Sequence, residues 1–184
     1  MLNKRILKGI IVVIICLFLT TTIYAETEVY FSHVDDIQAV IVLTINAAEE
    51  SIDVTMYTFT DLILANALSD AKDRGVVIRI YLDRSQVTAK YSQSRYFIQN
   101  NMNVRISSNH YIMHNKFAII DGKLLITGSY NWTESANTRN DENLIIIKCP
   151  YAIEIYQEQF ERLWDQYSPT LFEKLFKRAK EEVG

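Results

Sequence analysis

The chain has 184 residues, of which 49% are hydrophobic and 22% are charged, so it is long enough to form one domain with a substantial core. It carries 19 Lys and Arg against 22 Asp and Glu, a net charge of −3. This acidic balance excludes the class of proteins that bind nucleic acid through a broadly basic surface. Any attraction for phosphate groups must be local.

The first 25 residues are predicted to be a targeting segment. Three basic residues come first, an apolar run covers residues 9–19, and Ala25 ends a stretch of small and polar residues where a signal peptide could be cleaved. Cleavage would leave 16 basic and 22 acidic residues, a net charge of −6, and would place the protein in the periplasm or outside the cell. An uncleaved membrane anchor is the alternative, although the apolar run is short for a span of about 20 residues.

Short apolar strands alternate with amphipathic helices along the rest of the chain. Thr60 is expected to cap the second helix, and Gly75 to end it. The alternation predicts an α/β fold, an α-β-α sandwich with a central mixed β-sheet, formed by residues 26–184 as a single domain. Strands are predicted at 28–31, 51–57, 76–82, 103–106 and 143–148, and helices at 35–49, 61–74, 85–99, 151–167 and 170–180.

Two neighbouring stretches, 114–121 and 128–133, carry the chemistry that stands out. Apolar residues on both sides of an Asp-Gly pair predict two strands joined by a tight turn. His114 and Lys116 are two residues apart on the first strand, so they share a face. Asn131 lies just beyond the second strand, where the hairpin can bring its amide near that pair. An imidazole, a fixed cation and a neutral amide together suit a phosphoryl group.

Six residues of this region follow the pattern H-x-K-x4-D-x6-G-S-x-N: His114, Lys116, Asp121, Gly128, Ser129 and Asn131. The pattern resembles the signature of the phospholipase D superfamily. Its single copy in a short chain is most similar to the bacterial metal-independent, EDTA-resistant endonucleases of that superfamily. The resemblance covers about residues 28–167, includes the segment 57–60 that those proteins place beside the site, and implies a phospholipase D-like fold that agrees with the predicted sandwich.

The roles of the motif residues follow from chemistry and from this resemblance. An isolated histidine is most often structural, but here the spacing favours His114 as a nucleophile that forms a phosphohistidine. The resemblance makes Lys116 a phosphate ligand, and Asn131 is expected to bind the same oxygens without charge. Ser129 is expected to support substrate binding rather than to attack, because no separate general base is evident for it.

Two carboxylates complete the candidate catalytic set. Asp121 is the acidic residue of the motif, yet its place in an Asp-Gly turn predicts a mainly structural role, and the resemblance implies the same. Glu142 opens the strand at 143–148, and a carboxylate bound to the imidazole Nδ1–H would hold the tautomer that can attack. The resembling endonucleases have a Glu at the matching position, which favours Glu142 over Asp141. A solvated acid at Glu142 is the alternative.

One histidine cannot complete the reaction, because the nucleophile must be neutral while the leaving oxygen needs a proton. Neither of the other two histidines, His33 and His110, is followed by Lys two residues later. We therefore predict a homodimer in which a twofold axis brings two His114 side chains together, with a rate maximum at about pH 6–7. A metal held by His110 and His114 is the rival, but their stretch is predicted to be a loop entering a strand, so neither metal nor cofactor is expected.

The favoured function is that of a metal-independent phosphodiesterase, a nuclease of low sequence specificity acting on DNA or RNA. A phospholipase D that acts on phospholipid is the alternative, and a binding module without catalysis is a third class that the complete His, Lys and Asn set argues against. No base-reading motif is present. Candidate phosphate contacts besides Lys116 are Arg79, Arg84, Lys90, Arg95, Arg105 and Arg139, and tyrosines that could stack on bases or border a lipid groove are Tyr91, Tyr96, Tyr111 and Tyr130.

Overall fold

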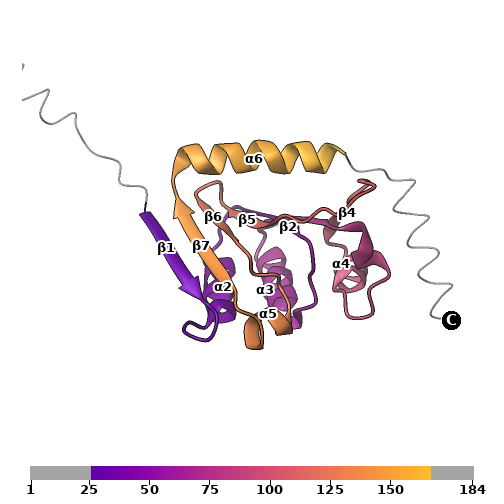
Figure 1. Ribbon diagram of the computed structural model, residues 1–184. Coiled ribbons are helices and arrows are strands. Elements are labelled where there is room, and N and C mark those ends of the chain that lie inside the picture. The colour runs from indigo at the N-terminus through magenta and orange to yellow at the C-terminus, as the bar shows by residue number, and fades with distance from the viewer. Residues whose placement is uncertain (1–25, 167–184) are drawn as a thin grey trace, which may run out of the picture.

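The structure, a computed structural model, describes residues 26–166 (Figure 1). The predicted targeting segment at 1–25 and the predicted helix at 170–180 lie outside these residues. Within the described part of the chain, no helix has the length and apolar character needed to cross a membrane.

The described elements follow the predicted alternation, and two strands have the predicted bounds. In chain order they are β1 (Glu26–Phe31), α2 (Ile37–Asn46), β2 (Ser51–Met56), α3 (Leu62–Asp73), β3 (Val77–Leu82), the 3-10 turn η1 (Arg84–Val87), α4 (Ser94–Gln99), β4 (Asn103–Ile106), β5 (Lys116–Ile120), β6 (Leu124–Gly128), α5 (Glu134–Thr138), β7 (Asn143–Lys148) and α6 (Pro150–Asp165).

Two local predictions were wrong. Asp61, not Thr60, caps α3, because its carboxylate accepts the free backbone N–H groups of Ile63 and Leu64 at 2.9 and 3.1 Å. The predicted helix at 85–99 is divided into η1 and α4. The intervening backbone bonds to another segment instead: Gln93 donates its backbone N–H to the Phe59 carbonyl oxygen at 2.9 Å.

All seven strands form one mixed sheet in the order β1-β7-β6-β5-β2-β3-β4. The half made of β2, β3 and β4 is parallel, β5 joins β2 antiparallel, and the remaining neighbours are antiparallel. As a result, β2, β3, β4 and β6 end at the edge of the sheet where β5 and β7 begin. Binding sites of open α/β sheets characteristically lie at the carboxyl ends of parallel strands.

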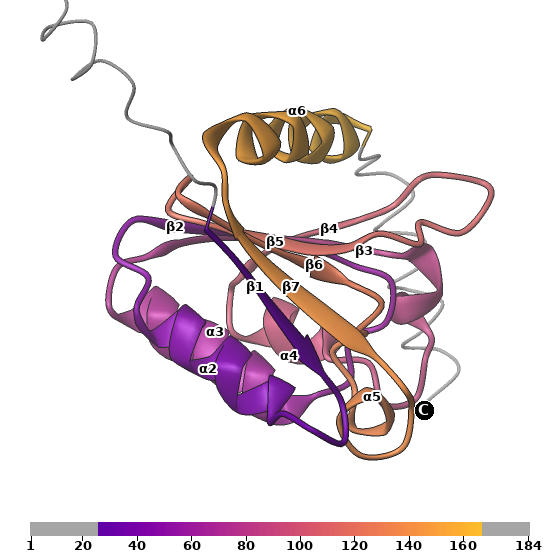
Figure 2. The ribbon, with the colours of Figure 1, turned by 60° about the vertical axis from the view of Figure 1, so that its left-hand side comes forward.

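Helices cover both faces of the sheet, as Figures 1 and 2 show. The helices α2 and α3 pack against one another and cover one face, and α6 lies across the other. The predicted α-β-α sandwich with a central mixed sheet is thereby confirmed. The core is correspondingly divided, with Ile41, Ile45, Leu64, Leu68, Val54 and Ile80 among the buried residues on the α2 and α3 side, and Tyr81, Phe117, Phe160 and Trp164 among those under α6.

A partly buried network of ion pairs links the sheet to α6. The Arg79 Nη2 atom lies 2.6 Å from Asp53 Oδ2 and 2.6 Å from Glu161 Oε1 of α6. The guanidinium also lies 4.7 Å from the centre of the Phe160 ring. Hydrogen bonds to Asp53 raise the pKa of Arg79 above its ordinary value, burial opposes this, and bonds to Glu161 reinforce it. Arg79 is therefore used structurally and is not available as a phosphate contact.

Candidate active site

His114 and Lys116 stand together where β5 begins. The Lys116 Nζ atom lies 3.3 Å from each ring nitrogen of His114, and it donates a hydrogen bond to the His114 carbonyl oxygen at 3.1 Å. The His114 side chain is exposed and Lys116 is half-buried. The pair is thus open to a substrate from solvent, with the ammonium beside the imidazole, as their two-residue spacing predicts.

Tyr57 forms one wall of this site. It follows β2, whose last residue, Met56, pairs with Lys116. The Tyr57 ring centre lies 4.4 Å from that of His114 and 5.2 Å from the Lys116 Nζ atom. The ring can therefore orient the imidazole by contact and the ammonium by a cation–π interaction. Sequence reasoning did not single out this residue, although the segment 57–60 pointed to its neighbourhood.

Asp83 holds the backbone that leads into His114. It lies at the carboxyl end of β3 and is completely buried. One carboxylate oxygen accepts the Met113 backbone N–H at 2.7 Å, and the other accepts the Ser85 backbone N–H at 2.9 Å. A buried carboxylate with several N–H partners is a rigid support. Nothing in the sequence distinguished this aspartate, because its partner lies 30 residues away.

Lys116 is partly shielded from solvent, and its charge interacts with that of Glu142. Burial lowers the pKa of Lys116 from its ordinary value, and the nearby Glu142 carboxylate opposes that shift. Desolvation also strengthens the attraction of the ammonium for a phosphate, since the effective dielectric constant falls.

Asn131 reaches the same edge of the sheet from β6. The antiparallel register sets Phe117 of β5 opposite Thr127 of β6, so the chain leaves β6 beside the start of β5. The next residue, Trp132, is buried, and its carbonyl oxygen accepts the backbone N–H groups of Thr60 and Asp61 at 2.9 and 3.0 Å. Within residues 26–166 the Asn131 Oδ1 atom is buried without a hydrogen-bond partner. The loop that carries the amide is thus anchored after Asn131 by Trp132. Before Asn131 it is anchored by the Ser129 and Tyr130 backbone N–H groups, which donate to the Asn143 carbonyl oxygen at 3.2 and 3.3 Å.

Glu142 does not make the predicted hydrogen bond to His114. Among the described residues its oxygens accept from the Ser129 hydroxyl and, at 3.0 Å, from the Asn140 side-chain amide. Ser129 is closer because β6 ends beside the start of β7, where the Ser129 Oγ also accepts the Asn143 backbone N–H at 3.0 Å. Glu142 therefore acts on Lys116 through its charge, and Ser129 positions that carboxylate.

Gly128 permits this close meeting of β6 and β7. Its φ is +144°, and a Cβ atom there would lie 2.3 Å from the Asn143 carbonyl oxygen. No other residue could occupy the position without moving one of the strands. The glycine of the motif is therefore required by the backbone that leads to Ser129 and Asn131.

Asp121 lies at the opposite end of β5 from His114, and its inclusion in the catalytic set is not supported by this placement. Its carboxylate accepts the backbone N–H groups of Glu49, Glu50 and Ser51 at 3.0, 2.8 and 2.9 Å. Burial alone would raise the pKa of Asp121, but the three N–H donors and Lys123 lower it on balance. Asp121 thus ties the hairpin turn to the start of β2, the structural role that its turn position predicts.

The four candidate tyrosines differ in exposure. Tyr130 is buried and the Tyr96 hydroxyl donates to Asn66, whereas Tyr91 and Tyr111 are exposed.

His110 and His114 lie in a loop before β5, not on a helix. Among residues 26–166, no group of three or more His, Cys, Asp or Glu side chains is arranged to hold a metal ion.

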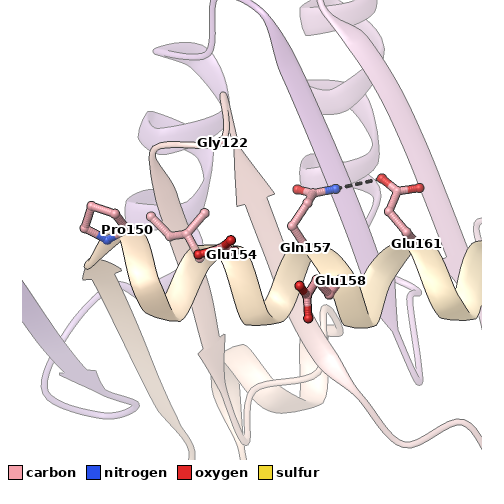
Figure 3. Close-up of a pocket in the computed structure, with 7 residues that line it drawn as sticks. Gly122, Pro150, Glu154, Gln157, Glu158 and Glu161 are labelled. Carbon is pink, nitrogen blue, oxygen red and sulfur yellow. Dashed lines mark hydrogen bonds between the residues drawn. The ribbon is translucent and has the colours of Figure 1, made fainter.

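A separate pocket of about 590 Å³ lies along α6, next to Gly122 at the hairpin turn (Figure 3). Glu154, Glu158 and Glu161 line it, and Gln157 donates a hydrogen bond to Glu161 at 2.9 Å. Three carboxylates would repel a phosphate group. This pocket is therefore unsuited to the substrate that the His114 site can take.

Comparisons with known proteins give relatives that are named phospholipase D and cardiolipin hydrolase. A phospholipase D from Rickettsia prowazekii is 44% identical over 123 residues, covering 66% of this chain and 60% of that protein. A mitochondrial cardiolipin hydrolase from Chlamydomonas reinhardtii is 36% identical over 123 residues, covering 67% of this chain and 55% of its own length. The chain therefore spans little more than half the length of these two relatives.

The crystal structure of Nuc, a phospholipase D family member from Salmonella typhimurium, superimposes with a TM-score of 0.74 at 30% identity. The match covers 79% of this chain and 97% of Nuc. The family described as "Cardiolipin synthase, PLD-like domain" matches residues 41–164, which include the whole motif from His114 to Asn131. The protein belongs to the phospholipase D superfamily, as a member of this PLD-like domain family.

Proposed function

We propose that the protein is a metal-independent phosphodiesterase that cleaves nucleic acid with His114 as its nucleophile. The observation that carries the proposal is the exposed His114 imidazole with the Lys116 ammonium 3.3 Å from its ring nitrogens. Asn131 lies at the same edge of the sheet. This set supplies a nucleophile, a cation for the non-bridging oxygens and an amide donor for the same oxygens.

The reaction proceeds in two displacements. An imidazole nitrogen of His114 attacks phosphorus, so that a P–N bond forms while the P–O bond to the leaving group breaks. Lys116 and Asn131 stabilise the negative charge that accumulates on the non-bridging oxygens. Water then attacks the phosphohistidine, the P–N bond breaks, and the imidazole is regenerated.

Each displacement also needs a proton to be moved, and a second copy of the chain supplies the group. The leaving oxygen takes a proton from the partner's His114, which later accepts one from the attacking water. Within the described residues no other histidine is bonded to His114, and His33 instead lies 3.7 Å from Asp141. A twofold contact at this edge of the sheet would bring two such imidazoles together.

Nucleic acid is preferred over phospholipid as the substrate because the single-copy motif most resembles that of the superfamily's endonucleases. In addition, this chain covers 97% of Nuc but only 55% and 60% of the relatives named cardiolipin hydrolase and phospholipase D. Phospholipid is the second candidate. It is favoured by relatives that are named phospholipase D and cardiolipin hydrolase. It is also favoured by the exposed Tyr111 and Ile112, 81% and 59% accessible, which closely precede His114 and could touch a lipid surface.

The test is a parallel assay of the purified protein and its His114→Ala variant, with a chelator present throughout. The substrates are plasmid DNA, single-stranded DNA, RNA and vesicles that contain cardiolipin. The proposal expects nucleic acid to be cleaved by the native protein alone. Cleavage of vesicles only would establish the phospholipid alternative, and an active His114→Ala variant would overturn the mechanism.

The character of residues 1–25 supports export as a further part of the proposal. The enzyme would then act outside the cytosol, with the N-terminal segment either cleaved after Ala25 or retained as an anchor. The mass of the protein recovered from periplasm, medium and membranes of expressing cells tests this directly.

A further inference from the structure

A second pocket, of about 530 Å³, is lined by residues of α5 and by residues that closely follow Tyr57 and Asn131 in the chain. One wall begins at Thr58, directly after Tyr57, whose ring contacts His114. The other wall begins at Thr133, two residues after Asn131. Both walls thus follow residues of the catalytic centre in the chain, which makes this pocket the candidate place for the group next to a phosphate bound at His114.

The lining of this pocket combines an aromatic ring, a cation and hydroxyl groups. Tyr91 is 69% accessible, and the Lys90 Nζ atom lies 5.1 Å from its ring centre. Arg139, at the end of α5, has an exposed side chain that forms no ion pair within the described residues. Thr58, Thr60 and Ser135 add hydroxyls, and Glu134 is the single acidic residue of the lining.

Exposed aromatic rings beside cations are the standard means of binding nucleic-acid strands. A base stacks on the ring, while Arg or Lys binds the flanking phosphate. Tyr91 is the single aromatic or aliphatic residue of the lining, and the other residues carry hydroxyl, carboxylate or guanidinium groups that an acyl chain would leave without polar partners. The chemistry of the lining therefore favours a nucleotide over a lipid tail.

We propose that this pocket is a nucleotide subsite, in which Tyr91 stacks on the base next to the scissile phosphate and Arg139 binds the following phosphate. The inference rests on the proposed nuclease function and adds the two residues that determine how the strand is bound. Because stacking needs an unpaired base face, the subsite selects substrates whose base is unstacked at the cleavage position.

The test compares Tyr91→Ala and Arg139→Ala with the native full chain on three substrates. These are a single-stranded oligonucleotide, the same oligonucleotide with an abasic residue beside the cleaved bond, and methyl p-nitrophenyl phosphate, which carries no nucleobase. Tyr151→Ala and Arg162→Ala, exposed positions of α6 on the other face of the sheet, are the matched controls.

We expect each subsite variant to lower kcat/KM on the intact oligonucleotide about ten-fold. The subsite variants should turn over methyl p-nitrophenyl phosphate at the native rate. Both control variants should keep the native rate on every substrate. The abasic residue slows the native protein to the level of Tyr91→Ala and does not slow Tyr91→Ala further, because the two changes remove the same interaction. Tyr91→Phe restores cleavage of the intact oligonucleotide.

Three results would overturn the subsite. Equal rates of native and variant proteins on the intact oligonucleotide remove it while leaving the nuclease function in place. Equal losses on the oligonucleotide and on methyl p-nitrophenyl phosphate show a structural role instead. If the native protein cleaves cardiolipin vesicles and no oligonucleotide, the proposed function and the nucleotide subsite both fall, and slower vesicle cleavage by Arg139→Ala would reassign the pocket to a lipid headgroup.

Discussion

The Lys116 ammonium lies 3.3 Å from both ring nitrogens of His114, so a phosphoryl group that reaches the imidazole would also lie beside the ammonium. We predict that Lys116→Ala lowers kcat about 10²–10³-fold on a phosphodiester substrate, the effect of losing one preorganised charge donor. Lys123→Ala, at the far turn of the same hairpin and paired with Glu50, should leave kcat unchanged. Initial rates at saturating substrate measure both effects. Equal rates for Lys116→Ala and Lys123→Ala would contradict the proposed role of Lys116 as a phosphate ligand.

The proposed pairing of two His114 side chains across a dimer axis predicts that inactive subunits lower the activity of native ones. When native protein is equilibrated with a five-fold excess of His114→Ala protein, specific activity per native chain should fall severalfold, because most native chains then pair with an inactive partner. The native enzyme should show a bell-shaped pH profile, because one imidazole must be neutral while the other is protonated. Undiminished activity in the mixture, or full activity at dilutions where sedimentation finds only monomer, would show that one chain suffices.

The Asp121 carboxylate and its three backbone donors predict a loss of stability without loss of catalysis. The folded state lowers the pKa of Asp121, so the carboxylate stabilises the fold above its unfolded pKa of about 3.8. That contribution disappears as the pH falls through the lower, folded pKa. Asp121→Asn should therefore lower the free energy of unfolding by about 1–3 kcal/mol at pH 7, and by progressively less below pH 4.

Urea unfolding of native and Asp121→Asn proteins across this pH range measures the difference, and phosphodiesterase assays at 25 °C run beside it. The exposed Asp141→Asn change serves as the control for loss of one carboxylate. A catalytic Asp121 would show the reverse pattern, with normal unfolding and a large fall in kcat.

Gly128 and Gly122 provide a matched pair of glycines on one hairpin. Gly122→Ala meets no atom within 4 Å and strains only a φ of +60°, so it should cost about 1 kcal/mol and leave activity intact. Gly128→Ala places a Cβ atom 2.3 Å from the Asn143 carbonyl oxygen. It must therefore shift β6 or β7, lowering both thermal stability and kcat by displacing Ser129 and Asn131. Similar melting temperatures for the two variants would refute this account of the motif glycine.

The local features of this protein were readable from its sequence because they depend on neighbours in the chain. The period of apolar residues predicted the layers, and the spacing from His114 to Asn131 predicted a hairpin with an imidazole, an ammonium and an amide at one end. The wrong helix prediction had a non-local cause. The helix expected at 85–99 is interrupted because Gln93 bonds to Phe59, a contact that no periodicity can reveal.

Only the tertiary structure determined which partner each charged group has. Asp121 binds residues 49–51, Asp83 binds Met113, Arg79 binds Glu161, and Tyr57 packs on His114. Glu142 shows most clearly what the sequence could not predict. Its carboxylate was expected to bond to the His114 imidazole and instead accepts a hydrogen bond from the Ser129 hydroxyl. A carboxylate binds whichever donor the strand order and register bring nearest. That choice is set by the assembled sheet, whereas residue type and spacing along the chain determine only which groups are offered.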